Sequence, residues 1–585
     1  MKKYTEDLRP KLEKLPIPDL HETLDALIEW TKPLMTNEEL SKFQEKVTTF
    51  GDSEGILLQK ELMQYTEQRK GSWLAPLWQE GYLESRGYLQ SESNFALIID
   101  QDFYKKIKTR EARAAQLIYH LTKIYLSLAN ETYPIEYTRN NQNVDMSFYP
   151  NFFKSCRIPG RKIDSFYKGE QGTANLFVVL IVSGVFFRLN VTDDKGNVYP
   201  IQQLLENLHY ILSLEIEPKQ QENLLPYLTS VGREESALIY QQLKKSKENL
   251  SNLMQIENAL FILSFSQGED HTANERINDV LLNTSHQFLA KTTQVILTKN
   301  GYIGFNLEHT AIDGVPTLNM LTELFASFTD QDWIVQDYSS SLVEKFEWVL
   351  ENDSVALLEK AKKVAEVENN SYSIKHQVIA GIGKERMKKG KVSPDAFFHI
   401  ALAMAQQTVF GKLRSVYEPV AMRMFYEGRT ESARSISQEK RDFAEAFYEQ
   451  KETVSKKELV ELFNKAATAH SNRISQCQKG KGIERHLFGL QKRAIQTDIT
   501  TRFFSEKAFK LLNEDFISTT GIPYELVESF SFGPVNKSGF GLYYGILPEK
   551  VVVTISAKKN NEYQLLQFIK AIEEALISLT NLLTI

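Results

Sequence analysis

Cysteine is almost absent from this sequence, since only Cys156 and Cys477 occur in 585 residues. Two cysteines cannot build a disulfide framework or a cysteine-rich zinc site, and such scarcity is typical of a reducing compartment. The net charge of −6 also excludes a bulk electrostatic attraction to nucleic acid or to anionic membranes. An anionic ligand would therefore need a local basic patch.

Long hydrophobic runs are missing as well. The most apolar stretch, LFVVLIVSGVFF at 176–187, is too short to span a bilayer. It predicts two buried strands or one bent strand. No apolar segment follows the first lysines, and the final NLLTI carries no lipidation or peroxisomal signal. We expect a soluble, cytoplasmic protein without a membrane segment, and a monomer.

Several catalytic motifs are absent too. There is no G-x-S-x-G elbow of a serine hydrolase, and Gly381-Ile382-Gly383 lacks the third glycine of a dinucleotide-binding loop. No histidine, cysteine or carboxylate pair with metal-ligand spacing lies near His309, so we expect no metal site.

Helical and strand patterns alternate along the chain, which is typical of an α/β protein with two large domains. TTQVILTKNGYIGFNLEHT at 292–310 predicts a hairpin around Asn300-Gly301, whose second strand leads to His309. Ser393 and Pro394 predict the start of a long helix. Apolar spacing predicts helices over 20–130 and 200–265, and strands over 130–190.

The motif HTAIDG at 309–314 is weak by itself. A histidine after a strand could be a base, a ligand or a structural side chain. His-x-x-x-Asp-Gly resembles the motif of coenzyme A-dependent acyltransferases related to chloramphenicol acetyltransferase, which peptide-synthesis condensation domains share. This resemblance favours a general base, but does not fix the substrate.

A wider series of blocks follows along the chain: LPIPDLHETLD (15–25), SCRIPG (155–160), EHTAIDG (308–314), SPDAFFHIALA (393–403), YEPVAMRMFYEGRTESARS (417–435), RHLFGL (485–490), STTGIP (518–523) and FGPV (532–535). Their order and approximate spacing resemble the choline/carnitine O-acyltransferase family over nearly the whole chain. The resemblance implies two similar α/β domains of the chloramphenicol-acetyltransferase type. One would span 93–350 and the other 1–92 plus 351–585, with an active-site tunnel between them.

The resemblance also implies the catalytic residues. His309 would act as the base in direct acyl transfer, without an acyl-enzyme, and Thr520 would stabilise the oxyanion. The triplet Ser518-Thr519-Thr520 stands for the family's Ser-Thr-Ser, and Gly521 replaces the usual Gln, so this part departs from the pattern. Asp313 and Gly314 would shape the loop rather than move protons.

The substrates follow from the same resemblance. Acyl-coenzyme A would be a co-substrate, with no tightly bound cofactor, and Lys384, Lys388 and Asp395 would contact its nucleotide half. The acceptor would be carnitine, because an Arg stands at the position that binds the carnitine carboxylate, where the choline enzyme has a neutral residue. The residues implied for the acceptor site are Tyr417, Thr430, Arg485, Ser518, Phe532 and Val535.

Phe530 stands where acetyl-transferring members of the family have Met and medium- and long-chain members have Gly, so the resemblance implies a short acyl group. A choline O-acetyltransferase or a medium- or long-chain carnitine acyltransferase is the alternative enzyme. A regulatory protein that binds acyl-coenzyme A on the same fold is the non-catalytic alternative, because Thr520-Gly521 departs from the family pattern.

Overall fold

The apolar run at 176–187 forms two strands rather than one bent strand. β4 (Phe177–Val182) and β5 (Val185–Asn190) pair antiparallel, and Ser183 and Gly184 turn the chain with φ angles of 51° and 78°. The predicted hairpin is also confirmed. β7 (Thr293–Leu297) and β8 (Ile303–Leu307) pair antiparallel, and Gly301 adopts a φ of 81° that glycine tolerates without strain.

The helical interpretation of 200–265 is wrong at its end. Residues Ile262–Phe265 form β6, which lies between β4 and β7 and runs parallel to both. All four of its residues are buried. A strand covered on both faces shows a continuous apolar run instead of alternation, so periodicity cannot distinguish it from a buried helix.

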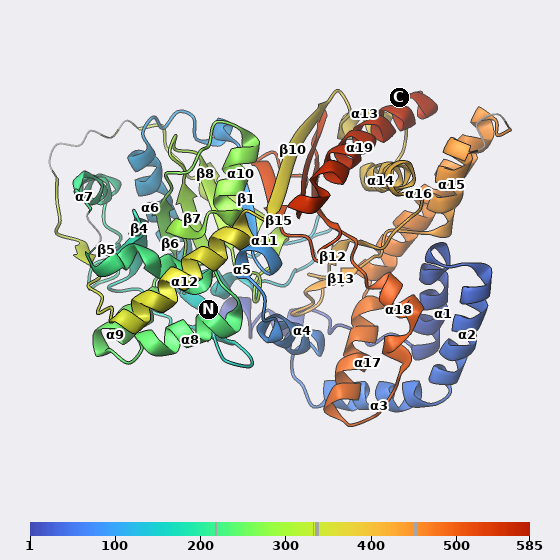
Figure 1. Ribbon diagram of the computed structural model, residues 1–585, viewed down its shortest axis with the longest axis horizontal. Coiled ribbons are helices and arrows are strands. Elements are labelled where there is room, and N and C mark those ends of the chain that lie inside the picture. Colours follow the sequence, from blue (N-terminus) through green and yellow to red (C-terminus); the bar gives the residue numbers. More distant parts are fainter. Residues whose placement is uncertain (217–218, 332, 334–337, 450–452, 585) are drawn as a thin grey trace. The chain divides into compact units, whose positions relative to one another are not determined.

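The computed structural model describes residues 1–216, 219–331, 333, 338–449 and 453–584. The chain divides into two compact units, drawn together in Figure 1. Unit 1 comprises Met1–Lys11, Gln79–Ile374 and Tyr524–Gly533, and unit 2 comprises Leu12–Trp78, Lys375–Pro523 and Pro534–Ile585.

Unit 1 contains a sheet of eight strands in the order β15-β1-β8-β7-β6-β4-β5-β9. Besides β4 to β8, unit 1 contains the strands β1 (Phe95–Ile99), β2 (Ser155–Ile158), β3 (Ser165–Lys168), β9 (Val343–Lys345) and β15 (Val527–Phe532), of which β2 and β3 pair with each other outside this sheet. Its helices are α5 (Leu89–Glu92), α6 (Arg110–Ala129), α7 (Ile201–Ser213), α8 (Arg233–Leu243), α9 (Lys247–Asn258), α10 (Ala273–Leu282), α11 (Gly314–Ala326) and α12 (Asn352–Asn369).

Unit 2 contains a five-stranded sheet in the order β10-β17-β16-β14-β11. Its strands are β11 (Val416–Tyr417), β12 (Pro419–Ala421), β13 (Thr430–Ser432), β14 (Ile517–Gly521), β16 (Phe540–Ile546) and β17 (Lys550–Lys558). Its helices are α1 (Leu20–Thr31), α2 (Asn37–Gly51), α3 (Glu54–Glu67), α13 (Lys384–Lys389), α14 (Pro394–Phe410), α15 (Gln438–Glu449), α16 (Lys456–Gln478), α17 (Glu484–Gln496), α18 (Lys507–Leu512) and α19 (Glu562–Leu583). The division between the units falls within α4 (Leu74–Glu84) and β10 (Tyr372–Ala380).

Residues far apart in the sequence share the cores of unit 2. Apolar side chains of α1–α3 form one core with those of α17 and α18, and Figure 1 shows these helices side by side. A second core joins α14, α16 and α19 to β16 and β17. Ser393 caps α14 as predicted, because its hydroxyl accepts a hydrogen bond from the Ala396 amide.

One strand departs most from the predicted domain limits. β15 follows the Ser518 block in sequence but pairs antiparallel with β1, so it belongs to the sheet of unit 1. Unit 1 is thus wider than the 93–350 expected from the sequence. Both units combine a sheet with helices, which confirms a mixed α/β class, while the tunnel stays a prediction. Among the described residues, no helix is long and apolar enough to cross a membrane.

Candidate active site

His309 lies two residues beyond β8, on the loop that leads into α11. Its side chain is 30% exposed, and Nδ1 is 2.6 Å from the carbonyl oxygen of Ile312. Because a carbonyl can only accept, Nδ1 carries the proton of the neutral ring and Nε2 keeps its lone pair. The loop therefore presents Nε2 as a base.

Aromatic rings surround the imidazole in unit 1. The ring centroid of Tyr82 is 5.4 Å from that of His309, and Phe95 approaches edge-on at 5.1 Å. Phe530 stacks on Phe95 at 5.3 Å, and its own neighbour Phe532 is 6.3 Å away. Because β15 pairs with β1, Phe530, the predicted acyl-pocket residue, is separated from His309, the predicted base, by the ring of Phe95.

Asp313 and Gly314 lie where the loop becomes a helix. Gly314 is the first residue of α11, and the Asp313 carbonyl accepts a hydrogen bond from the Thr317 hydroxyl. The Asp313 carboxylate is 3.8 Å from Nδ1 of His309, which is longer than a hydrogen bond. The nearer partner of Nδ1 is a backbone carbonyl, so the geometry offers no proton relay through Asp313.

Three of the predicted acceptor residues meet in unit 2. Arg485, on α17, is 4% exposed. Its Nη2 donates to the Tyr417 hydroxyl at 2.8 Å, and its Nε donates to the Thr430 carbonyl at 2.7 Å. α17, β11 and β13 thus hold one buried cation among polar groups.

Trp78 and Glu431 complete the surroundings of Arg485, and sequence reasoning missed both. The guanidinium carbon lies 3.8 Å from the ring centroid of Trp78, a cation–π contact. The Glu431 carboxylate accepts from the backbone amide of Arg485 at 3.1 Å, and burial raises the pKa of Glu431 to about 7. Burial therefore opposes a full negative charge on Glu431 beside the Arg485 guanidinium.

β14 carries the hydroxyl triplet at 518–520. Ser518 is paired in register with Tyr417 of β11, and Thr519 donates to the Tyr417 carbonyl at 2.8 Å. Since side chains alternate along a strand, Ser518 and Thr520 share the other face. Ser518 is buried, and its hydroxyl finds no hydrogen-bond partner among the described residues. A buried hydroxyl of this kind is suited to a ligand or to water.

The departure at Gly521 has a local physical explanation. A β-carbon at this position would lie 2.5 Å from the hydroxyl of Tyr544, on the neighbouring strand β16. The space that a larger side chain would need is therefore filled by the tyrosine ring. Tyr544 in turn donates its hydroxyl to Asp395 at 2.7 Å.

Asp395, predicted near the coenzyme A nucleotide, belongs to a buried polar cluster that sequence reasoning missed. His470 is 2.8 Å from its other oxygen, Oδ2. His399, one helical turn along α14, lies 3.0 Å from the Tyr544 hydroxyl and 3.2 Å from Glu418. The only available signals were the i, i+4 spacing of Asp395 and His399 and the position of Glu418 beside Tyr417.

The ionisable groups of this cluster influence one another. Burial opposes ionisation of Asp395, but His470 and His399 hold its pKa well below the usual range. Burial, and then the charge of Asp395, raises the pKa of Glu418 to about 8. Burial likewise lowers the pKa of Lys440 to about 7. The negative charge is therefore favoured at Asp395 and opposed at Glu418.

The same cluster offers a possible set of metal ligands. Among the described residues, Asp395, His399 and Glu418 each have one ligand atom within 4.8 Å of the others. However, the neighbouring His470 already engages this cluster, since its Nδ1 lies 2.9 Å from the Lys440 nitrogen and its Nε2 lies 2.8 Å from Asp395. The arrangement favours a proton-sharing network rather than a metal centre.

The remaining predicted residues are the two lysines of α13, Phe532 and Val535. Lys384 and Lys388 are one turn apart on α13, and neither forms an ion pair within the described part of the chain. Phe532 is half-buried beside Phe530, whereas Val535 is 65% exposed. Unit 1 therefore gathers His309, Phe530 and Phe532, and unit 2 gathers Arg485, Tyr417 and Thr430.

Known proteins resemble this chain over most of its length. The sequence model described as Choline/Carnitine o-acyltransferase matches residues 15–574. Carnitine O-acetyltransferase of the rat (Rattus norvegicus) is 26% identical to this chain, and the match covers 98% of this chain and 93% of the rat protein. Carnitine O-palmitoyltransferase 2 of Xenopus tropicalis is 25% identical, and the match covers 98% of this chain and 92% of that protein. Choline O-acetyltransferase of Gallus gallus is 26% identical, and the match covers 100% of this chain and 95% of that protein. Among solved structures, a condensation domain of the enacyloxin polyketide synthase matches 87% of this chain and 81% of its own chain at 10% identity, with a TM-score of 0.35.

The raised pKa of the buried Glu418 predicts how the stability of the protein changes with pH. Its folded-state pKa is about 8 against an ordinary 4.5, so it contributes stability below about pH 4.5 that is lost as the pH rises to 8. Glu418→Gln removes this titration, and we expect the variant to gain stability relative to wild type from pH 5 to 8. Denaturant unfolding across this range measures the difference. The exposed Glu359→Gln should give a small and constant difference, and the same flat result for Glu418→Gln would contradict the assignment.

Proposed function

The chain belongs to the choline/carnitine O-acyltransferase family, and from this premise we propose that it transfers a short acyl group, acetyl above all, between coenzyme A and carnitine. Membership of the family makes the protein an acyltransferase. The acceptor, the acyl length and the roles of individual residues are the proposed parts. Relatives of both acceptor types have similar identity to this chain, so residues rather than overall similarity must decide between them.

The buried guanidinium of Arg485 carries the choice of acceptor. Carnitine bears a carboxylate, whereas choline has no anion to pair with a buried cation. A guanidinium can meet a carboxylate with two parallel hydrogen bonds. Tyr417 and Thr430, which already contact Arg485, would supply further hydroxyl groups to the same carboxylate. We assign Phe532 to the trimethylammonium group, where a cation–π contact is expected.

The geometry at His309 supports general base catalysis. Nε2 would take the proton from the acceptor hydroxyl as that oxygen attacks the thioester carbonyl, a contribution of roughly 10²–10⁴-fold. We assign Thr520 to the oxyanion of the tetrahedral intermediate. When the carbon–sulfur bond breaks, the imidazolium returns its proton to the thiolate of coenzyme A.

No cysteine competes with this direct route. Cys156 and Cys477 are both buried, and burial raises the pKa of each thiol above its usual value. A nucleophilic cysteine requires a lowered pKa and access to the substrate. Both features argue against a thioester intermediate on the enzyme.

The basic helix α13 supports binding of coenzyme A. Lys384 and Lys388 lie on one face, because residues four apart are neighbours on a helix. Flexible ammonium groups at the surface suit a phosphate that stays partly in water. We therefore assign these two lysines to the 3′-phosphate and Asp395 to the nucleotide half.

The stacked rings of Phe530 and Phe95 support a short acyl group. Phe95 contacts the His309 ring, and Phe530 lies directly behind it at 3% exposure. An acyl chain that passed this point would have to displace an aromatic ring from the core. A long chain requires a glycine-sized residue at 530 instead.

Replacement of Arg485 tests the acceptor. Arg485→Asn should raise the carnitine KM at least 30-fold, because unpairing a buried ion costs about 2–5 kcal/mol, and should improve choline relative to carnitine. A thiol-release assay with acetyl-coenzyme A and each acceptor measures both. Arg493→Asn, on the same helix, is the matched control and should leave the carnitine KM within about twofold. Unchanged carnitine kinetics in Arg485→Asn would exclude this acceptor site.

Replacement of Phe530 tests the acyl length. We expect wild type to use acetyl-coenzyme A and to show little activity with octanoyl- or palmitoyl-coenzyme A, whereas Phe530→Gly should gain octanoyl transfer. The control Val527→Gly removes another buried side chain from β15 and should not broaden the range. Efficient palmitoyl transfer by wild type would show that the acyl group passes elsewhere.

A further inference from the structure

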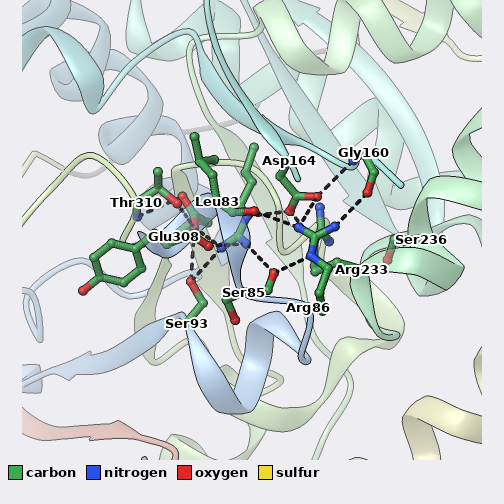
Figure 2. A network of polar contacts seen from close by, with 12 residues as sticks. Leu83, Ser85, Arg86, Ser93, Gly160, Asp164, Arg233, Ser236, Glu308 and Thr310 are labelled. Atoms are coloured by element: carbon green, nitrogen blue, oxygen red, sulfur yellow. Dashed lines mark hydrogen bonds and ion pairs between the residues drawn. The ribbon is translucent and has the colours of Figure 1, made fainter. Parts of the chain in front are cut away.

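Arg157 is among the most deeply buried cations in the described part of the chain, at 1% exposure. It comes from β2, in the SCRIPG block. Burying an arginine is costly unless its donors find partners. Figure 2 shows the network of polar contacts to which its partners belong.

The guanidinium connects three separate backbone segments. Nε donates to Asp164 at 2.7 Å. Nη2 donates to the carbonyls of Tyr82 at 2.6 Å and Ser85 at 3.1 Å, while Nη1 lies 3.4 Å from Glu308. Tyr82 and Glu308 are both neighbours of His309, one through its ring and the other along the chain.

Glu308 fixes the backbone on both sides of His309. Its carboxylate accepts from the Thr310 hydroxyl at 2.6 Å and from the Thr310 amide at 3.2 Å. Ser93 donates to the same carboxylate at 3.2 Å. Glu308 is fully buried, and Figure 2 shows Ser93 and Thr310 beside it. The residue between Glu308 and Thr310 is His309, so this closed ring of hydrogen bonds determines where the imidazole leaves the chain.

Tyr82 fixes the imidazole from the side. Its ring centroid is 5.4 Å from that of His309, and its carbonyl is held by Arg157. One guanidinium therefore holds the backbone of the residue whose ring packs against the imidazole, as well as the carboxylate behind it. Neither restraint contacts a reacting atom.

We propose that Arg157 is the positioning residue of His309, which it orients through Glu308 and Tyr82 so that Nδ1 keeps its bond to Ile312 and Nε2 faces the acceptor hydroxyl. The catalytic half of this inference rests on the proposed function. The orientation of the ring does not, and can be measured without any substrate. Misplacement of a catalytic group by about 1 Å costs about 10²-fold in rate.

Arg233 provides a matched control in the same network. It is fully buried, and its Nε donates to the same oxygen of Asp164 at 2.7 Å. It makes no hydrogen bond to Glu308 or Tyr82 within the described part of the chain. Arg233→Lys therefore replaces a second buried arginine bonded to Asp164, and it should leave His309 in place.

The experiment compares kinetics of the two lysine variants. Arg157→Lys should lower kcat about 10- to 100-fold while the KM values for acyl-coenzyme A and carnitine stay within about twofold. Arg233→Lys should keep kcat within about threefold of wild type. Equal kcat losses in both variants, or a kcat of Arg157→Lys within threefold of wild type, would overturn the proposal.

Nuclear magnetic resonance of nitrogen-labelled histidine supplies the second measurement. The His309 signals are those lost in His309→Gln. Wild type and Arg233→Lys should show the Nδ1–H tautomer, and Arg157→Lys should show a mixture of tautomers. An unchanged tautomer in Arg157→Lys would refute the positioning role. If wild type transfers no acyl group to carnitine or choline, the proposed function fails, while this spectrum still decides the orientation.

If Arg157→Lys does not fold, Glu308→Gln carries the test. It preserves the size of the side chain but removes the charge paired with Arg157. The same loss of kcat and the same mixture of tautomers are expected. Normal kcat with an unchanged tautomer in this variant would also overturn the proposal.

Discussion

The 2.6 Å hydrogen bond from Nδ1 of His309 to the Ile312 carbonyl is the constraint on which the proposed chemistry depends. It forms within four residues of the chain, on the loop between β8 and α11, and we propose that Arg157 holds this loop through Glu308 and Tyr82. Because the carbonyl cannot donate, the neutral ring has one tautomer in this conformation. A base with its lone pair on a known atom is the simplest requirement for deprotonating an alcohol.

Buried charge supports this constraint in unit 1 and appears again in unit 2. Arg157 and Arg485 are both almost inaccessible to solvent, and each directs its donors at named backbone and side-chain acceptors. Such groups add little to stability compared with apolar residues of the same size, but removing one partner is strongly destabilising. Their value lies in the fixed positions they give to His309 and to the proposed carboxylate site.

Local features of the fold could be predicted from the sequence, and long-range pairings could not. Asn300-Gly301 and Ser393-Pro394 specify a turn and a helix start through their own conformational preferences. β6 was misread because a fully buried strand has no period, and the transfer of β15 to the sheet of unit 1 depends on a partner more than 400 residues away in sequence. The site shows the same division. The resemblance named Arg485, Tyr417 and Thr430, which the structure brings together, whereas Glu418, His470 and Lys440 gather around Asp395 without any sequence motif.

The most direct measurement of the central claim, that Nε2 of His309 is the base, is the rate of thiol release by His309→Ala with acetyl-coenzyme A and carnitine. Calorimetry with coenzyme A alone should show binding close to that of wild type, because Lys384 and Lys388 are unchanged. The account predicts a loss of activity of at least about 10²-fold, the lower end of a general base contribution. Activity within tenfold of wild type, with coenzyme A still bound, would contradict it.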